Sequence, residues 1–222
     1  WLQIGLITLA PLRVLAIAAI AAQVIWSRYV DDWQLGAATM AWIAAFVWTC
    51  LMGKEFFCGE WLAKRLTLYA FSHMLVMPLI VGLLVNLGAS GVGLSNSVIW
   101  LRALAFVSGC CFEITRKTRG TEEERDTVDS YSRIFGSSGA ATVITVLVLA
   151  MGALQLLLIS ELSATLPCWA LIVIIAFTLM ALLSLQAYRK QPTEKGREKN
   201  EASVALLMLA GYAVTIAAAL SA

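Results

Sequence analysis

The sequence is poor in charged residues, and this scarcity decides its broad class. Of the 222 residues 14% are Asp, Glu, Lys or Arg, whereas a soluble globular domain has roughly 25%. The hydrophobic share is 60% and the mean hydropathy is +0.83. Too few charges remain to cover a soluble body of this size, which excludes a soluble domain and a disordered chain. The composition predicts a polytopic membrane protein.

Histidines and paired cysteines are also scarce. The chain has one histidine, and its five cysteines contain no C-x-x-C pair. A structural zinc site needs grouped Cys and His ligands, and a secreted disulfide framework needs an even set of cysteines. Both classes are therefore excluded. We interpret the five thiols as small apolar fillers, at Cys50, Cys58, Cys110, Cys111 and Cys168.

Long apolar runs are abundant. A helix needs about 20 mostly apolar residues to cross a bilayer. The longest charge-free run, Leu66–Leu101, exceeds one crossing, and the Gly/Ser/Asn cluster Gly88–Ser97 divides it. The runs are continuously apolar and do not alternate, which favours helices over barrel strands. We predict an all-α membrane bundle, one transmembrane domain over residues 1–222, with seven helices at about 4–26, 34–52, 66–87, 97–113, 139–160, 165–187 and 202–221.

Lysine and arginine are distributed unequally between the six loops of this assignment. Thirteen of the sixteen lie in the second, fourth and sixth loops, whereas the first, third and fifth contain only Arg28. Because basic loops remain on the cytoplasmic side, we predict a cytoplasmic N-terminus and an external C-terminus. Arg13 and Arg102 fall inside helices near an end, and we expect their side chains to reach the membrane surface.

The fourth loop carries the densest group of charged side chains. Glu113 ends the predicted fourth helix, and Arg116 and Lys117 follow three and four positions later. If the helix continues inward, this spacing places all three on one face. Carboxylates and bases together can hold a divalent cation and a phosphorylated ligand. The alternative is a solvated loop whose charges pair with one another and with anionic headgroups.

The second loop and the third helix supply further polar candidates. Glu55 and Glu60 can add carboxylates to a cytoplasmic site or remain ordinary loop acids. His73 lies in the third helix, four positions after Tyr69. An ionisable residue inside the membrane suggests function, yet a neutral imidazole costs less than a charge and can be satisfied by a neighbouring helix. Both interpretations of His73 stay open.

Three segments within about residues 50 to 136, taken together, resemble a bacterial branch of the UbiA superfamily of intramembrane prenyltransferases. They lie in the second loop, the third helix and the fourth loop. The residues that carry the resemblance are Glu55-Phe-Phe-x-Gly-Glu60, then Tyr69-x-x-Ser72-His73, and then Glu113-Ile-x-Arg116-Lys117-x-Arg119 with Asp129-x-Tyr131-Ser132.

This resemblance implies a larger fold. Members of the superfamily have nine helices and two Asp-rich metal motifs, the first of them after the second helix. Matching the fourth loop of this chain to the sixth loop of nine helices leaves two helices and the first motif without a counterpart. On this basis we expect the first helical pair and the first metal motif upstream of Trp1.

Within the second motif the chain departs from the family pattern. Glu113 stands where the first acid belongs, Arg116 replaces the next acid, and Glu123 meets the third only across an insertion. The implied site therefore has fewer metal ligands and more bases than usual. The Mg²⁺ ligands implied by the resemblance are Glu113, Glu123 and Asp126. The implied substrate-binding residues are Arg116, Lys117, Arg119, Tyr131 and His73.

The implied function is transfer of a prenyl group from a prenyl diphosphate donor to a lipophilic or aromatic acceptor. The reaction is expected at the cytoplasmic face of a bacterial inner membrane, among membrane lipids and without nucleic acid. Mg²⁺ and bases would bind the diphosphate, and an allylic cation would form in an apolar cavity. The alternative is a membrane protein without chemistry, either a prenyl diphosphate binder without turnover or a carrier of lipids or small molecules.

Overall fold

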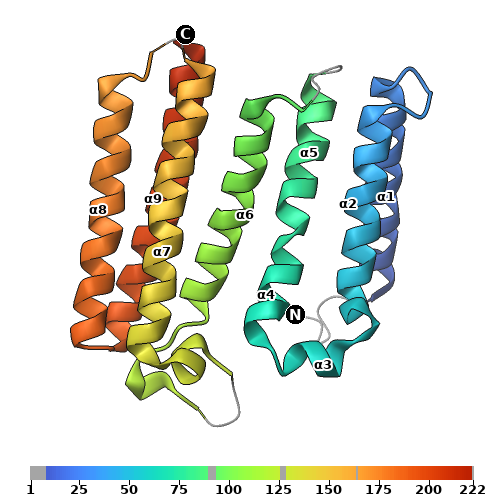
Figure 1. The fold of residues 1–222 in the computed structure, drawn as a ribbon. Helices are drawn as coiled ribbons and strands as arrows, with labels where there is room; N and C mark the ends of the chain where they lie inside the picture. Colours follow the sequence, from blue (N-terminus) through green and yellow to red (C-terminus); the bar gives the residue numbers. More distant parts are fainter. Residues whose placement is uncertain (1–8, 90–93, 126–128, 164, 222) are drawn as a thin grey trace.

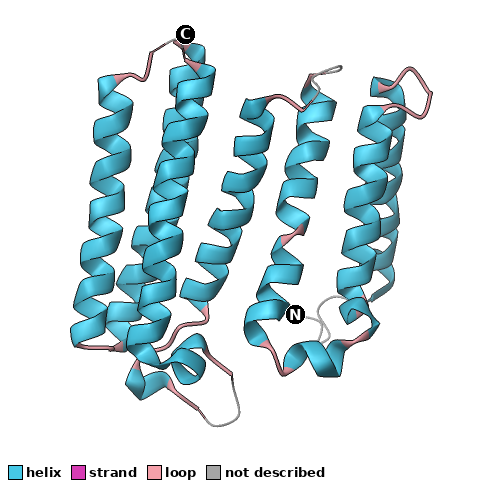
Figure 2. Cartoon of the chain, viewed as in Figure 1, coloured by secondary structure: helices cyan, strands magenta, loops and turns pink. Residues whose placement is uncertain are grey.

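A computed structural model describes residues 9–89, 94–125, 129–163 and 165–221. These residues form helices joined by turns and loops, with no β-strand among them (Figure 2). This confirms the predicted all-α class for the described part of the chain. The elements in chain order are α1 (Leu9–Val30), α2 (Ala37–Gly53), the 3-10 turn η1 (Glu55–Phe57), α3 (Gly59–Ala63), α4 (Leu66–Met74), α5 (Val76–Gly88), α6 (Asn96–Arg116), the 3-10 turn η2 (Thr121–Glu123), α7 (Tyr131–Leu162), α8 (Cys168–Lys190) and α9 (Glu194–Leu220).

Six helices of the described residues are long and apolar enough to cross a membrane. One of them is Leu66–Gly88, in which α4 and α5 follow each other across a short break at Leu75. The remaining apolar helix, α2, has 17 residues. It spans about 25 Å at 1.5 Å per residue, less than the ~30 Å hydrocarbon core. The predicted count of seven thus corresponds to six qualifying helices and one shorter apolar helix.

The helices stand side by side along one common direction (Figure 1). α1 packs on α2 at one edge, α2 packs on α5, and α5 packs on α6 in the middle. α7, α8 and α9 form the other edge and pack on one another, and α6 contacts both α7 and α9. The short elements η1, α3 and η2 lie together at one end of the bundle, opposite the end of α9 (Figure 1).

The core lies between α6, α7, α8 and α9. Its large side chains, such as Leu104, Ile144 and Met151, are fully buried. Small residues alternate with them, and Ala140 and Ala141 have no exposed surface. Inside a membrane, lipid is as apolar as leucine, so helices associate through close van der Waals packing that small residues allow. This group of four helices therefore forms a firm support for the loops at its ends.

Two predicted helix starts were wrong by two turns. α7 begins at Tyr131 and not at 139, and α9 begins at Glu194 and not at 202. Both starts have a side-chain cap: Ser130 Oγ accepts from the Arg133 amide at 3.0 Å and Thr193 Oγ1 accepts from the Gly196 amide at 3.2 Å. Hydropathy marks only the part of a helix inside the membrane, whereas capping and helix propensity also extend it through charged residues.

The remaining boundaries shift by a few residues. α6 continues to Arg116, three residues past its predicted end, and α1 continues to Val30. Residues 4–8, at the predicted start of the first helix, lie outside the described part of the chain. The interpretation of the cysteines holds for Cys110 and Cys111, which are buried, but is wrong for the other three, which are exposed.

Within α7 the backbone departs from helical geometry at one residue. Gly136 has φ +70° and ψ 159°, and a Cβ at this position would meet no atom within 4 Å. Glycine is required here by backbone conformation alone, since other residues avoid this region. This bend at Gly136 separates the first residues of α7, including Tyr131 and Ser132, from the long apolar part of the helix that follows.

Candidate functional site

The last turn of α6 carries an ion-pair cluster at the charged end of the bundle. One carboxylate oxygen of Glu113 lies 2.8 Å from Arg116 Nη2, and the other lies 2.8 Å from Lys117 Nζ. The prediction that these three side chains share a helix face is confirmed, because α6 continues inward past Glu113. The side chain of Arg116 is 52% exposed and that of Lys117 is 28% exposed. Both bases are therefore accessible to a ligand, with Glu113 as their common counter-charge.

A second polar group lies on α4 and the preceding turn. The ring of His73 stacks on Tyr69 with 4.0 Å between ring centroids, and its Nδ1 lies 2.9 Å from the Tyr69 carbonyl oxygen. Its other nitrogen, Nε2, lies 3.6 Å from Glu55 Oε2. The Tyr69 hydroxyl donates to Glu55 Oε1 at 3.1 Å. The carboxylate of Glu55 therefore contacts both Tyr69 and His73. The ring of His73 is held by stacking on Tyr69 and by its contact with the Tyr69 carbonyl oxygen.

The two groups meet over the ring of Tyr69. Lys117 Nζ lies 5.3 Å from the centroid of this ring, within the range of a cation–π contact. The Tyr131 hydroxyl also connects the start of α7 to the start of α4, because it donates to the Leu66 carbonyl oxygen at 3.1 Å. Tyr131 is fully buried, so this hydroxyl holds α7 against α4. Three segments far apart in the sequence thus form one polar surface, built by η1, α4 and the end of α6.

The second half of the fourth loop is fixed to α9. Glu123 accepts from Arg197 at 3.0 Å and 3.2 Å and from the Gly120 amide at 2.9 Å. Arg197 also pairs with Glu201, one turn later, at 3.0 Å. Glu201 in turn acts electrostatically on Arg116. The ion pairs therefore join η2 to the start of α9, along the charged end of the bundle.

Arg119 contributes to this loop through its backbone, and Glu122 contributes through its carboxylate. The Arg119 amide donates to Ser132 Oγ at 2.8 Å, and the Arg119 carbonyl accepts from the buried Tyr188 hydroxyl. The carboxylate of Glu122 accepts from the Glu194 amide at 2.7 Å at the start of α9. This hydrogen bond lowers the pKa of Glu122 below its ordinary value, since it favours the ionised form. The position of the loop is thus set by contacts with α8 and α9.

The predicted metal ligands are not brought together among the described residues. Glu113 and Glu123 belong to separate ion-pair groups, each already neutralised by arginine or lysine. Asp126 lies outside the described residues. In the described part of the chain no three His, Cys, Asp or Glu side chains gather as a cation would require. The described carboxylates therefore do not fit a Mg²⁺ centre on their own.

Sequence reasoning missed Arg197 and Glu201, which lie at i and i+4 of α9. Placing the helix start at the Thr193 cap would have put the two on one face.

Arg102 is a further correction: its guanidinium lies against Gly82, well inside α5, so it does not extend to the membrane surface. Its Nε is buried with no hydrogen-bond partner among the described residues. Gly82 has no side chain, and this leaves room for the guanidinium of Arg102 against α5.

Comparison with known proteins identifies no relative of this chain. Protein-family models, curated proteins and solved structures contain no match to this chain. A functional assignment therefore depends on the residues of this chain and on their geometry.

Proposed function

We propose that this chain is a UbiA-like intramembrane prenyltransferase. It crosses the membrane with the six qualifying helices and with α2 as a seventh crossing, with its charged end in the cytoplasm of a bacterial cell. It transfers a prenyl group from a prenyl diphosphate to a lipophilic or aromatic acceptor. The six apolar helices support the membrane location, and thirteen of sixteen lysines and arginines fall in the three loops assigned to the cytoplasm.

One observation carries the proposal: the three segments that resemble the superfamily are adjacent in space. Glu55, Tyr69 and Lys117 come from three different segments, and the hydroxyl and ring contacts of Tyr69 join them. Residues that merely cover a cytoplasmic surface have no reason to gather from segments that are 14 to 62 residues apart. A site for a charged ligand provides such a reason, because it needs several side chains at one point.

The bases of this surface suit a diphosphate. Arg116 presents a planar guanidinium that can hold two phosphate oxygens at once, and Lys117 adds a second charge beside it. Both now share the carboxylate of Glu113. A diphosphate carries more negative charge than one carboxylate, so it can displace Glu113 from both bases. In the proposal Glu113 holds the bases in position before the substrate arrives, and Arg119 adds a further base on the adjoining loop.

The chemistry follows from neutralising the leaving group. When the bases stabilise charge on the diphosphate, the allylic C–O bond breaks and the diphosphate leaves with the electron pair. The acceptor attacks the resulting allylic cation and loses a proton. An apolar cavity of about 430 Å³ lies between α6, α7 and α9, with Leu101 and Leu158 in its wall. It is near the opposite end of the bundle, since Leu101 precedes Glu113 by twelve residues, about 18 Å along α6. In the proposal it receives only the far end of a long isoprenoid chain. His73 stands beside the bases, where it can orient an acceptor.

The family resemblance also implies Mg²⁺. Since the described carboxylates do not assemble a ligand set, no step of this proposal passes through a metal ion. Dependence on Mg²⁺ stays a prediction of the resemblance.

The proposal can be tested with the full chain in lipid nanodiscs. Farnesyl, geranylgeranyl and longer prenyl diphosphates with a labelled prenyl group are offered together with a bacterial lipid extract as the source of acceptor. Release of inorganic diphosphate and transfer of label into the extract are measured in parallel. We expect both for the wild type, and loss of both for Lys117→Ala. Lys190→Ala is the matched control, because Lys190 is an exposed base at the same end and outside the site.

The outcomes separate the two functional classes. Transfer by the wild type and by Lys190→Ala, but not by Lys117→Ala, supports the enzyme. Saturable binding of a prenyl diphosphate without release of diphosphate would indicate a binding protein without turnover. Absence of binding for every chain length would refute the proposed site.

A further inference from the structure

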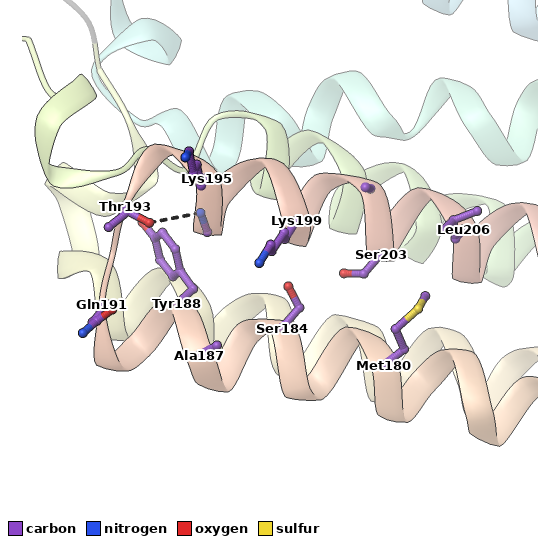
Figure 3. Close-up of a pocket in the computed structure, with 12 residues that line it drawn as sticks. Met180, Ser184, Ala187, Tyr188, Gln191, Thr193, Lys195, Lys199, Ser203 and Leu206 are labelled. Atoms are coloured by element: carbon purple, nitrogen blue, oxygen red, sulfur yellow. Dashed lines mark hydrogen bonds between the residues drawn. The ribbon is translucent and has the colours of Figure 1, made fainter.

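A groove runs between α8 and α9, on the side away from the proposed site. Its volume is about 540 Å³. Figure 3 shows the two helices side by side, with Lys199 of α9 and Ser184 of α8 extending toward the space between them. Lys195 also lines the groove, one turn nearer the start of α9, and its side chain is turned away from α8. Met180 and Leu206 line the opposite end. The groove is therefore basic at the charged end of the bundle and apolar toward the middle of the membrane.

The arrangement of the lining follows from helix periodicity. The α9 side is formed by Lys195, Lys199 and Leu206, and the α8 side by Gln191, Ser184 and Met180. The intervals along each set are four or seven residues, so each set occupies one helix face. The two helices are antiparallel. The polar residues of α8 and α9 therefore lie at the same end of the groove, and their apolar residues lie together at the other end. From Met180 to Gln191 the groove extends about 16 Å along α8.

The two lysines lack a counter-charge. Lys195 and Lys199 stand four residues apart, a spacing at which like charges repel. Among the neighbouring acids, Glu198 and Glu201 pair with Arg197, and Glu194 forms no ion pair with either lysine among the described residues. No described carboxylate forms an ion pair with either lysine. A bound anion would remove this repulsion.

Buried polar atoms lie at the middle of the groove, between its basic and apolar ends. Ser184 Oγ donates to Asn200 Oδ1 at 2.7 Å, and Ser203 Oγ donates to the Asn200 carbonyl at 3.0 Å. Asn200 is 1% exposed, and its Nδ2 has no hydrogen-bond partner among the described residues. A buried amide donor normally has an acceptor. Asn200 lies behind the lining, so the middle of the groove itself presents the hydroxyl groups of Ser184 and Ser203.

We propose that the α8–α9 groove binds an anionic phospholipid of the bilayer. Its phosphate lies beside Lys199, with Lys195 adding positive charge one turn away, and its glycerol ester oxygens lie at the level of Ser184 and Ser203. One acyl chain follows the apolar end past Met180. Charge complementarity selects an anion, and the apolar half within the membrane selects a molecule with a hydrocarbon chain over a free phosphate. The site is separate from the proposed transferase site and does not depend on it.

The test measures which lipid stays on the full-length protein. The protein is reconstituted in vesicles of equimolar phosphatidylcholine and phosphatidylglycerol, extracted mildly, and its bound lipids are counted by native mass spectrometry. We expect enrichment of phosphatidylglycerol on the wild type. Because each lysine near the surface contributes roughly fivefold to anionic-lipid binding, Lys199→Gln should reduce the enrichment about fivefold and Lys195→Gln/Lys199→Gln about 25-fold.

Matched variants separate the groove from general effects. Lys190→Gln removes the same charge from an exposed position outside the groove and should keep the enrichment. Ala187→Trp fills the groove while leaving both lysines, and should abolish the enrichment. Ala176→Trp makes the same change at an exposed position of α8 outside the groove and should have no effect.

Three results would overturn the proposal. The wild type could retain both lipids equally, or Lys190→Gln could lose as much phosphatidylglycerol as Lys199→Gln. The third is displacement of the bound lipid by soluble sn-glycerol 3-phosphate, which would mean that the lysines select a free phosphate. Thermal unfolding of each variant identifies any that fails to fold, and enrichment on the wild type decides the question independently of the variants.

Discussion

At the scale of single residues, the positive charges of Arg116 and Lys117 are already paired with the carboxylate of Glu113 before any ligand binds. Glu113 lies within 2.8 Å of both Arg116 and Lys117 and is itself only 16% exposed. An arginine held by a neighbouring carboxylate loses less conformational freedom when a ligand binds. The carboxylate also competes with the ligand for the same donors. Removing either partner should therefore affect transfer, but through different steps.

The first prediction concerns Arg116 and Glu113. Arg116→Ala removes a direct donor to the developing charge of the leaving group, and Glu113→Ala removes the group that positions both bases. We expect each to lower the rate of prenyl transfer by about 10²–10³-fold, the effect of losing one preorganised donor. Expression should be unchanged, since Arg116 is half-exposed. Wild-type rates in both variants, measured by label transfer, would refute the site assignment.

The second prediction concerns Glu122 and pH. Its pKa is lowered in the folded protein by the hydrogen bond from the Glu194 amide, relative to an ordinary value of 4.5. A lowered folded-state pKa stabilises the protein above the ordinary pKa, and this stabilisation is lost as the pH falls through the lowered value. The melting temperature of Glu122→Gln should therefore lie below that of the wild type at neutral pH.

As the pH falls below 4.5, we expect the two melting curves to converge. Glu60→Gln serves as the control, because Glu60 is exposed and its carboxylate forms no hydrogen bond or ion pair with the described residues. A difference between Glu122→Gln and the wild type that stays constant across this range would show that the hydrogen bond has no influence on stability.

At the scale of secondary structure, contacts between helices depend on residues without a side chain. Gly211 of α9 lies against Gln155 of α7, whose Nε2 donates to the Leu207 carbonyl at 3.2 Å. Gln155 is fully buried. A polar side chain inside a membrane bundle is stabilised when it bonds to the neighbouring helix. The glycine allows α9 to approach closely enough for this bond to form.

The third prediction follows from this contact. A Cβ at position 211 would overlap the carboxamide of Gln155, so Gly211→Ala should lower the free energy of unfolding by about 1–3 kcal/mol, as overpacking does. The measurement is reversible unfolding in mixed detergent. Gly88→Ala is the control, because no atom lies within 4 Å of the added carbon. In a Gln155→Ala background the same glycine substitution should cost clearly less, and an equal cost in both backgrounds would contradict the overlap.

At the scale of the whole molecule, most of the charged groups occupy one end, while the α1–α2 turn with Arg28, Asp31 and Asp32 lies at the other. The turn with Glu55, the end of α6 and the start of α9 lie there, and the loop before α8 lies at the other end (Figure 1). Cytoplasmic retention of basic loops gives the proposed orientation. Two native cysteines report on it, since Cys58 and Cys168 are exposed and lie at opposite ends.

The fourth prediction uses these two thiols. In variants that keep only Cys168 or only Cys58, a membrane-impermeant maleimide added to spheroplasts should label Cys168 directly. It should label Cys58 only after the membrane is permeabilised. The opposite pattern would reverse the proposed orientation and place the candidate site outside the cell.

The sequence by itself determined the class of the protein, the approximate position of its helices and the asymmetry of its charge. These are properties of local composition: a run of apolar residues enters the membrane wherever it occurs, and basic loops stay on one side. The cluster of Glu113, Arg116 and Lys117 was also predictable, because its spacing is that of a single helix face.

The tertiary structure decided which of the charged groups meet. Glu123 was predicted beside Glu113 as a metal ligand, yet it pairs with Arg197, which follows 74 residues later. Glu55 reaches His73 and Tyr69 because α4 turns back beside η1. Such contacts depend on how helices pack and where they begin, and neither hydropathy nor spacing along the chain contains that information. The α8–α9 groove has the same origin, since its lysines and the polar groups of α8 line one space only once the two helices lie antiparallel.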